Sequence, residues 1–475
     1  MIKGEEMNDI KQIVQTLFAN NNLSVPKNRA AQFDKFLNDE QTIQLVQSII
    51  NHQNLLMDKW KRENRVAEIM QQSVRILNAT VGKPYEAKID FEKNKWKDIV
   101  SYQFEGLEAV GLAFDEKTKQ IVGVPTQSGD VRIMFKFKLE GEPEEAAFHE
   151  KPFLLVINPD PKALWKNIES DRNDPYWKED NLTVFEPLGD RHILASSRRG
   201  RSHANIGSFR EDDFGFRHFE DSGWSIVAVA DGAGSAKLSR KGSALACTTV
   251  VDYFSENLTP ESFVEFDELL AQHKEGRGDN TQKKLNRFVY NYLGKAALHV
   301  HKKLEEFAKS TQVALKDLST TLIFTLFKKY DIGYAFLSFG VGDCPIALLN
   351  KDASEVMLMN WLDVGEYGGG TRFITMPEIF QSDKFATRFG FKLVDDFSYL
   401  FLMSDGIYDP KFVVEANLQD IRKWKEFLAD LGGKNEDGIK VELTPDNKDI
   451  RDQLSAWMDF WSAGNHDDRT LVIVF

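Results

Sequence analysis

Residues 224–236 read WSIVAVADGAGSA, and this stretch decides how the rest of the chain is interpreted. Seven apolar or small residues without a charge lead into Asp231. Such a run, ended by a glycine turn, predicts a short strand that is buried on both faces. Gly232 and Gly234 allow the backbone to turn sharply and let a ligand approach the main chain. Asp231 would then lie at the rim of the core, where a carboxylate must be paired, protonated or bound to a metal.

The same arrangement recurs in four other segments of the chain. FREDDFGF, LSFGVGD, YLFLMSDG and NHDDRTLVIVF place Glu211, Asp212, Asp213, Asp343, Asp405, Asp467 and Asp468 at the ends of apolar strands. Any one of these acids alone is typical of an ordinary turn. Together they favour one shared pocket, in which crowded carboxylates repel one another unless cations neutralise them. Oxygen ligands of this kind suit Mg²⁺ or Mn²⁺.

The motifs, taken as an ordered set, resemble a known family. FREDDF, ADGAGSA, STTLIFTLF, VGDCP, FLMSDGIYD and HDDRTLVIV are similar to motifs of the metal-dependent type 2C (PPM) serine/threonine protein phosphatases, in a divergent bacterial branch. The resemblance covers about residues 189–475 and implies an α/β fold, a four-layer α-β-β-α sandwich of two mostly antiparallel sheets flanked by helices. The grouping of strands and helices from residue 189 onward fits the same layered architecture.

The resemblance implies a role for each of the main acids. Asp212, Asp231, Asp405 and Asp467 would be the catalytic metal ligands, and the backbone carbonyl of Gly232 would be a further ligand. The family uses two divalent ions, Mg²⁺ or Mn²⁺, to turn a bridging water into the hydroxide that attacks phosphorus. Asp231 would bridge the two ions.

Three further acids stand next to these motifs or end another strand. Asp343 matches the acid that helps to bind a third, weaker metal in bacterial relatives. Asp213 and Asp468 either support the site from behind or are exposed acids, and the second interpretation is slightly favoured.

The phosphate-binding part departs from the family pattern. Gly207 stands where the family commonly places an arginine, five residues before the metal aspartate. Arg201 could replace it, because a guanidinium can hold phosphate oxygens bidentately. His203 lies in a segment that is similar to the GxSH segment of the divergent branch, and it could bind phosphate or act as a general acid. A solvated basic turn with a structural histidine is an equal alternative.

Residues 351–392 correspond to the flap beside the active site in the family. Gly365 and Gly368–Gly370 precede Thr371 and Arg372, either of which could meet substrate. A surface loop without a special role explains the segment equally well.

The first 188 residues predict separate modules. Residues 1–77 carry helical periodicity and predict a helical N-terminal region. Residues 78–158 alternate apolar residues with turn residues, which is typical of a small β-sandwich. The segment GLAFDEKTKQIVGVPTQSGD resembles bacterial immunoglobulin-like and cadherin-like domains, which hold partners or act as spacers. Residues 159–188 are expected to be an irregular linker before a phosphatase domain at 189–475.

The composition excludes several classes of function. A net charge of −13 argues against a nucleic-acid-binding surface. The beginning of the sequence, MIKGEEMNDIKQ, has no targeting signal, and no apolar run is long enough to span a membrane. Only Cys247 and Cys344 are present, which favours a reduced, cytoplasmic protein. Neither cysteine is followed by an arginine at the spacing of a thiol phosphatase loop.

These features predict a Mg²⁺- or Mn²⁺-dependent phosphatase that acts on phosphoserine or phosphothreonine in a phosphorylated protein. The family suggests a partner Ser/Thr kinase as one substrate, selected by the N-terminal modules. An alternative is a catalytically silent phosphatase-like scaffold, which the missing arginine keeps open. Another two-metal phosphoesterase, such as a nuclease, fits the acidic charge poorly.

Overall fold

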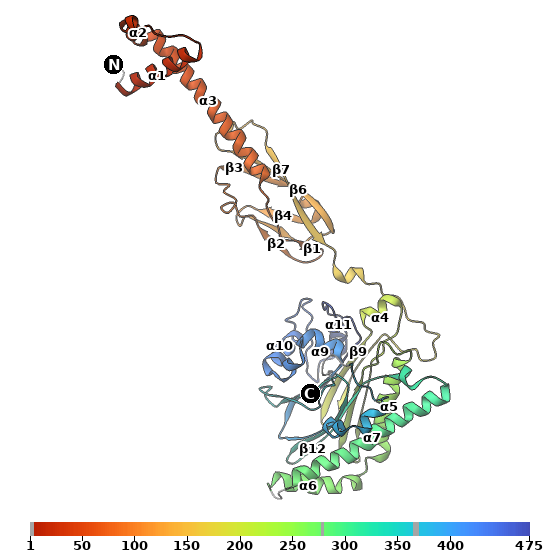
Figure 1. Ribbon diagram of the computed structural model, residues 1–475. Helices are drawn as coiled ribbons and strands as arrows, with labels where there is room; N and C mark the ends of the chain where they lie inside the picture. The colour runs from red at the N-terminus through yellow and green to blue at the C-terminus, as the bar shows by residue number, and fades with distance from the viewer. Residues whose placement is uncertain (1–3, 277–279, 364–369) are drawn as a thin grey trace. The chain divides into compact units, whose positions relative to one another are not determined.

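The computed structural model describes residues 4–276, 280–363 and 370–475, which are drawn in Figure 1. The chain divides into two compact units, Met1–Leu164 and Trp165–Phe475. Among the described residues, no helix combines the length and the apolar character that crossing a bilayer requires.

The first unit begins with three helices, α1 (Gly4–Asn20), α2 (Ala30–Leu37) and α3 (Glu40–Gln71). Asp39 caps α3, because its carboxylate accepts a hydrogen bond from the Thr42 N–H at 3.1 Å. Apolar side chains from the three helices form a small core of Ile10, Val14, Phe33, Leu37 and Val46. The far end of α3 packs elsewhere, since Ile69 belongs to the core of the strands that follow.

Two small sheets make up the rest of the first unit. The larger has the order β1 (Ala79–Thr80), β7 (His149–Asn158), β6 (Gly129–Leu139), β3 (Ile99–Glu105). The smaller has the order β2 (Tyr85–Lys88), β5 (Gln120–Gly123), β4 (Leu112–Asp115). Alternate residues of β6 enter the core, and Trp96 stacks on Phe135 with ring centroids 5.0 Å apart.

The second unit contains two larger sheets in which every strand pair is antiparallel. The five-stranded sheet has the order β10 (Asp213–Phe219), β11 (Trp224–Ala230), β12 (Leu322–Tyr330), β13 (Gly333–Val341), β16 (Phe389–Val394). The six-stranded sheet has the order β15 (Val356–Leu358), β14 (Ile346–Asn350), β17 (Phe397–Met403), β18 (Arg469–Val474), β9 (Arg191–Arg198), β8 (Asn181–Leu188).

Helices cover the outer face of each sheet (Figure 1). The long helices α5 (Ser239–Asn257), α6 (Val264–Lys274) and α7 (Thr281–Thr311) share one core with the five-stranded sheet. The helices α9 (Asp405–Phe412), α10 (Ile421–Leu431) and α11 (Ile450–Trp457) share a second core with the six-stranded sheet. Two short helices, α4 (Arg201–Ile206) and α8 (Glu378–Gln381), complete the unit. The predicted α/β fold is confirmed.

A third core lies between the two sheets, and β11 shows how one strand serves two cores. Every residue of β11 is buried. Trp224, Ile226, Ala228 and Ala230 belong to the helix-side core, whereas Val227 and Val229 belong to the core between the sheets. This alternation follows from the two-residue repeat of a strand. The strand predicted from residues 224–230 is therefore present and buried on both faces.

Residues 159–188 differ from the irregular linker that the sequence predicts. Residues from Trp165 onward belong to the second unit, and β8 pairs with β9 along its whole length, from Asn181 with Arg198 to Leu188 with Arg191. β8 is an edge strand, so Pro187 costs it little, because no strand lies beyond it to accept an N–H. Because β8 contains polar residues and a proline, its sequence does not show the apolar pattern that predicts a strand.

Candidate metal centre

The predicted acids lie at one end of the sandwich because of the antiparallel pairing. Asp212 precedes β10 and Asp231 follows β11, and the register pairs Asp213 with Ala230. On the opposite sheet Asp405 follows β17 and Asp467 precedes β18, where Met403 pairs with Leu471. In an antiparallel pair the end of one strand lies beside the start of the next. Each sheet therefore brings its acids to a common edge.

The electrostatics of Asp231 show how closely these acids approach. Burial raises the pKa of the Asp231 carboxyl well above its ordinary value, and the charges of neighbouring carboxylates raise the pKa further. Those neighbours are Asp212, Asp405, Asp467 and Asp343. Burial likewise raises the pKa of Asp405, together with the charges of Asp467, Asp343 and Asp212. The five acids therefore lie near enough for their charges to act on one another.

The remaining acids of the cluster are perturbed in the same direction. Burial, and then the charge of Asp468, raises the pKa of Asp212 to about 7, although Thr470 Oγ1 donates to Asp212 Oδ2 at 2.8 Å. The pKa of Asp467 is raised by burial and by Asp468. The pKa of Asp343 is raised mainly by burial, while Thr371 Oγ1 donates to its Oδ2 at 2.7 Å. Without a cation, these carboxylates are held in an unfavourable arrangement.

Two carboxylate oxygens test whether a metal would fit. Asp405 Oδ1 and Glu211 Oε2 are buried, and neither has a hydrogen-bond partner among the described residues. Burial raises the pKa of Glu211 to about 7. A buried acceptor without a partner costs free energy, which a bound cation would recover. The donor set is made of oxygens, so it suits Mg²⁺ or Mn²⁺.

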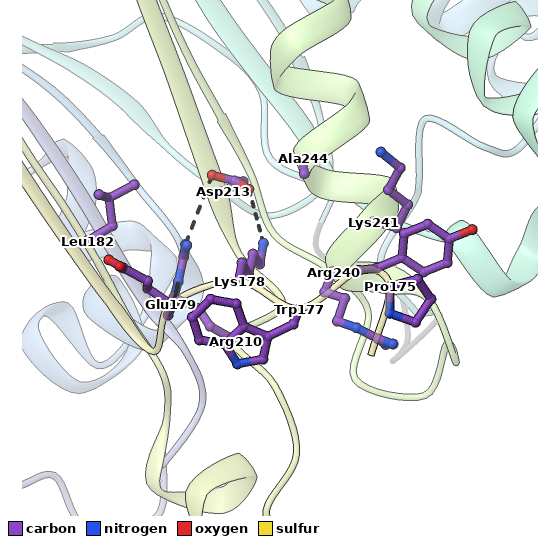
Figure 2. Close-up of a pocket in the computed structure, with 11 residues that line it drawn as sticks. Pro175, Trp177, Lys178, Glu179, Leu182, Arg210, Asp213, Arg240, Lys241 and Ala244 are labelled. Atoms are coloured by element: carbon purple, nitrogen blue, oxygen red, sulfur yellow. Dashed lines mark hydrogen bonds and ion pairs between the residues drawn. The ribbon is translucent and has the colours of Figure 1, made fainter. Parts of the chain in front are cut away.

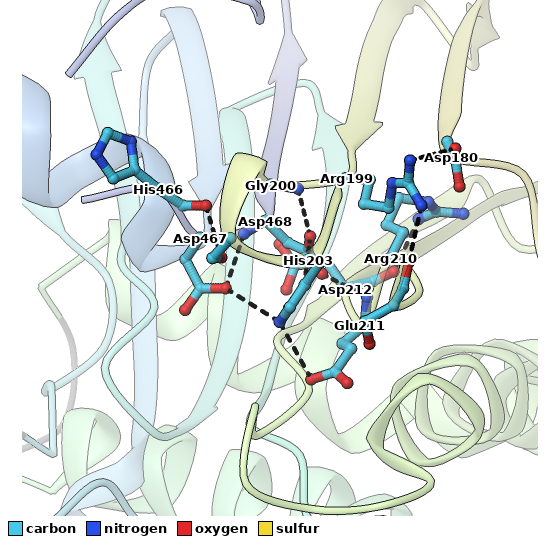
Figure 3. Close-up of polar contacts among 12 residues, drawn as sticks. Asp180, Arg199, Gly200, His203, Arg210, Glu211, Asp212, His466, Asp467 and Asp468 are labelled. Carbon is cyan, nitrogen blue, oxygen red and sulfur yellow. Dashed lines mark hydrogen bonds and ion pairs between the residues drawn. The ribbon is translucent and has the colours of Figure 1, made fainter. Parts of the chain in front are cut away.

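His203 lies against the same acids, and Figure 3 shows its ring between them. Nδ1 is 3.0 Å from Asp468 Oδ1, and Nε2 is 3.9 Å from both Glu211 Oε2 and Asp467 Oδ1. Burial alone would lower the pKa of His203, but the hydrogen bond to Asp468 and the surrounding charges raise it to about 9. At neutral pH the ring therefore carries a proton on both nitrogens. Although His203, Asp467 and Asp468 place ligand atoms within 4.8 Å of one another, a protonated imidazole offers a metal no lone pair.

Asp468 is not the exposed acid that the sequence slightly favours. Its residue is only 2% exposed, and it accepts hydrogen bonds from His203, from the Gly200 N–H at 2.6 Å and from the Glu211 N–H. Burial alone would raise the pKa of Asp468, but these hydrogen bonds lower it. Asp468 thus fixes the backbone on either side of the site.

Asp213 is not an exposed acid either. Its side chain is 16% exposed and lies 3.1 Å from Lys178 Nζ. Lys178 Nζ also donates to the main-chain carbonyl of Asp212 at 2.7 Å, and Arg210 Nη1 donates to the same carbonyl at 2.7 Å. The sequence gives no sign of the role of Lys178, because this residue lies in the segment expected to be a linker.

Arg201 is held away from the acids by a contact of its own. Its Nη2 donates to both the carbonyl and the Oδ1 of Asp459 at 2.7 Å, and its guanidinium lies 5.8 Å from the centroid of Trp461. Arg199 is engaged as well, with Ser208, Asn167 and Ile168. The structure therefore brings His203 to the acid cluster but not Arg201.

Gly232 lies where the backbone of another segment approaches closely. A Cβ at this position would lie 2.6 Å from the Glu211 carbonyl oxygen and 3.0 Å from Ser239 Cβ. Gly232 also bridges to Thr320, and the carbonyl of Asp231 accepts hydrogen bonds from the N–H of Thr321 and from Thr320 Oγ1, both at 2.8 Å. This packing fixes the turn after β11 that presents Asp231 to the cluster.

In the region expected to be the flap, Thr371 contacts Asp343 as described above, and Gly365, Gly368 and Gly369 lie outside the described residues.

His466, next to Asp467, packs between Trp165 and Trp461, with ring centroids 4.4 and 4.9 Å away. Its side chain is thus held by aromatic packing.

The family model described as "Protein phosphatase 2C" matches residues 199–457, which is more than half of the chain. No curated protein matches the chain by sequence.

Solved bacterial phosphatases are also similar to the chain. A serine/threonine phosphatase from Staphylococcus aureus is 13% identical, covering 62% of this chain and 98% of its own, with a TM-score of 0.35. One from S. agalactiae is 14% identical, covering 60% and 99%, with a TM-score of 0.36. The catalytic domain of PstP, solved with 2 manganese ions, is 15% identical, covering 62% and 98%, with a TM-score of 0.35. On the strength of the family-model match, this chain belongs to the protein phosphatase 2C family.

Proposed function

We propose that this protein is a divalent-metal-dependent phosphatase that hydrolyses phosphoserine and phosphothreonine in proteins. The observation that carries the proposal is the convergence of Asp212, Asp231, Asp405 and Asp467, whose pKa values are all raised by burial and by the charges of neighbouring carboxylates. Carboxylates gathered in this way are unfavourable by themselves and favourable around cations. The unpartnered oxygens of Asp405 and Glu211 support the same reading.

The residues that would hold the ions follow from this arrangement. We assign Asp212, Asp231, Asp405, Asp467 and the carbonyl of Gly232 to two Mg²⁺ or Mn²⁺ ions. Asp343, hydrogen-bonded to Thr371, would hold a third. When bound, such ions lower the pKa of water and offset the charge of the phosphoryl group.

The other residues of the site would orient these ligands. The Thr470 hydroxyl donates to Asp212 Oδ2 at 2.8 Å and so orients that carboxylate. Asp468 binds the N–H groups of Gly200 and Glu211 and so fixes two segments that are far apart in the chain. Protonated His203 supplies a positive charge beside Glu211 and Asp467, where it can bind a phosphate oxygen or give a proton to the leaving alkoxide.

Replacing His203 with glutamine should lower kcat/KM by about 10²-fold, because a charged donor to phosphate is lost. The pH profile separates this role from a structural one. In the wild-type enzyme kcat/KM should fall as the pH rises through the pKa of His203, which is about 9 in the metal-free protein and lower when cations are bound. In the variant this alkaline limb should be absent. A variant that keeps the limb, with a normal melting temperature, would show that another group titrates there.

The test of the proposed function is hydrolysis of p-nitrophenyl phosphate and of a phosphothreonine peptide with and without Mn²⁺. We expect turnover that depends on the ion, and a loss of about 100-fold in the Asp405→Asn variant, which keeps the shape of the side chain but removes its charge. The variant should remain folded, as measured by its melting temperature. Turnover by purified protein that is unaffected by chelation would contradict the proposal.

A second candidate function, a catalytically silent scaffold, is favoured by one observation. Arg201, which could have replaced the family's phosphate-binding arginine, is bonded to Asp459. The same assay discriminates the two: a scaffold would bind phosphopeptide without releasing phosphate from either substrate.

The partner and the setting are also part of this proposal. We propose that the helical region 1–77 and the β-sandwich 78–158, immunoglobulin-like by its sequence motif, select the phosphorylated protein substrate, and that a partner Ser/Thr kinase is the first substrate to test. Cys247 and Cys344 are buried free thiols, which suits a reducing, cytoplasmic setting.

A further inference from the structure

Figure 2 shows a pocket of about 460 Å³, which is within the range of small-molecule sites. Its walls are residues 175–179, Leu182, the strand start at Asp213 and the first turns of α5. Successive residues of a strand point to opposite sides. Asp212 accordingly points to the acid cluster, whereas Asp213 lines this pocket.

The pocket is lined by more cationic than acidic side chains. Lys178, Arg210, Arg240 and Lys241 line it, with only Glu179 and Asp213 as acids. Lys178 is already satisfied, because its ammonium bonds the Asp212 carbonyl, Asp213 Oδ2 and Ser243 Oγ. The donors still available must therefore come from the other cations.

Arg240 and Lys241 retain donors without an acceptor among the residues that the structure describes. The Arg240 guanidinium lies 4.0 Å from the centroid of Phe209, and its Nη1 and Nη2 donate to the Lys237 carbonyl and to Asp174. Its Nε is buried and has no acceptor among the described residues.

Lys241 differs from the other cations of the pocket. Its Nζ lies over the rings of Tyr176 and Phe307, at 5.8 and 5.3 Å from their centroids. No ion pair of Lys241 occurs in the described part of the chain. The buried Nε–H of Arg240 lacks an acceptor and the ammonium of Lys241 lacks an ion pair, so both groups would be stabilised by a bound anion.

The rest of the wall is apolar and partly planar. Pro175, Tyr176, Trp177, Leu182 and Ala244 provide this surface beside the cations. We propose that the pocket binds a small organic anion, in which a phosphate or carboxylate group meets Lys241 and Arg240 and a planar apolar body lies against Tyr176 and Trp177. The site is separate from substrate phosphate binding at the acid cluster, and the proposal does not depend on catalysis.

The position of the pocket gives such a ligand a route to the metal centre. Lys178 and Arg210 line the pocket and both donate to the main-chain carbonyl of Asp212. A ligand bound beside these two residues should therefore alter the affinity of the acid cluster for Mn²⁺.

The experiment is isothermal titration calorimetry of the full chain with phenylphosphonate, whose P–C bond a phosphatase does not hydrolyse, and with phenylacetate. We expect binding by the wild type and by Asp405→Asn, and at least tenfold weaker binding by Lys241→Ala. Lys241→Arg should keep the affinity, since it keeps the charge. Lys237→Ala is the matched control, because Lys237 is exposed and its side chain does not line the pocket.

The outcomes are distinct. Tighter binding of phenylphosphonate identifies a phosphate ligand, and tighter binding of phenylacetate identifies a carboxylate. Failure of both compounds to bind the wild type overturns the proposal. So does binding that Asp405→Asn abolishes and Lys241→Ala retains, because the anion would then lie at the acid cluster.

Discussion

Asp231→Asn is expected to abolish phosphatase activity and at the same time to stabilise the metal-free protein. Four other carboxylates, those of Asp212, Asp405, Asp467 and Asp343, all raise the pKa of Asp231. If it bridges two ions, loss of its charge removes several kcal/mol of transition-state stabilisation, which corresponds to a fall of about 10³-fold in kcat/KM. Without metal, the same change removes a repulsive charge and should raise the melting temperature in EDTA.

The two effects are measured by p-nitrophenyl phosphate hydrolysis with Mn²⁺ and by calorimetric melting in EDTA. Asp331→Asn is the matched control, because Asp331 is exposed in the turn between β12 and β13 and should change neither quantity. An Asp231→Asn protein that keeps most of its activity, or that melts at a lower temperature in EDTA than the wild type, would contradict the assignment of Asp231 as the central ligand.

The metal-free protein should lose stability as the pH rises, and added Mn²⁺ should remove this dependence. Burial raises the pKa of Asp212 and of Glu211 to about 7, from ordinary values of 3.8 and 4.5. A group whose pKa is raised by folding stabilises the protein fully below its unfolded pKa and loses that contribution as the pH rises through its folded pKa. For these two acids the loss falls between about pH 4 and pH 7.

His203 extends the same trend to higher pH. Although burial alone would lower its pKa, Asp468 and the nearby acids raise that pKa from 6.5 to about 9, so its contribution is lost between those values. Since one pKa unit is about 1.4 kcal/mol, each of the three groups should lose on the order of a few kcal/mol between pH 5 and pH 9.

Calorimetric melting of the full chain across this pH range, in EDTA and in Mn²⁺, measures the effect. Bound cations hold the carboxylates ionised, so the melting temperature of the second unit should vary much less with pH in Mn²⁺. Equal pH dependence with and without Mn²⁺ would mean that the acid cluster does not bind the ion.

The strand-end acids could be predicted from the sequence because two regular patterns coincide there. The uncharged run 224–230 marks a strand with two buried faces, and the residue after such a run must lie at the edge of a sheet. Asp343 and Asp405 follow the same rule after β13 and β17. These positions depend only on local pattern, so each could be recognised without knowing its neighbours.

The partners of those acids could not be predicted, because they come from irregular segments. Lys178 precedes an edge strand that carries a proline, yet its ammonium binds the Asp212 carbonyl. Asp468 looks like its neighbour Asp467 in the sequence, but the backbone turns it inward to accept hydrogen bonds from Gly200 and Glu211. Arg201 and His203 are two residues apart, and only the fold directs one to Asp459 and the other to the acids.

By itself the sequence determined the α/β class, the strands that end in acids and the family. Each of these can be recognised from short-range periodicity or from the order of short motifs. The tertiary structure alone decided which charges meet. Hydrogen bonds and Coulomb forces act over a few ångströms between residues that lie hundreds of positions apart, such as His203 and Asp468, and no local pattern records that distance.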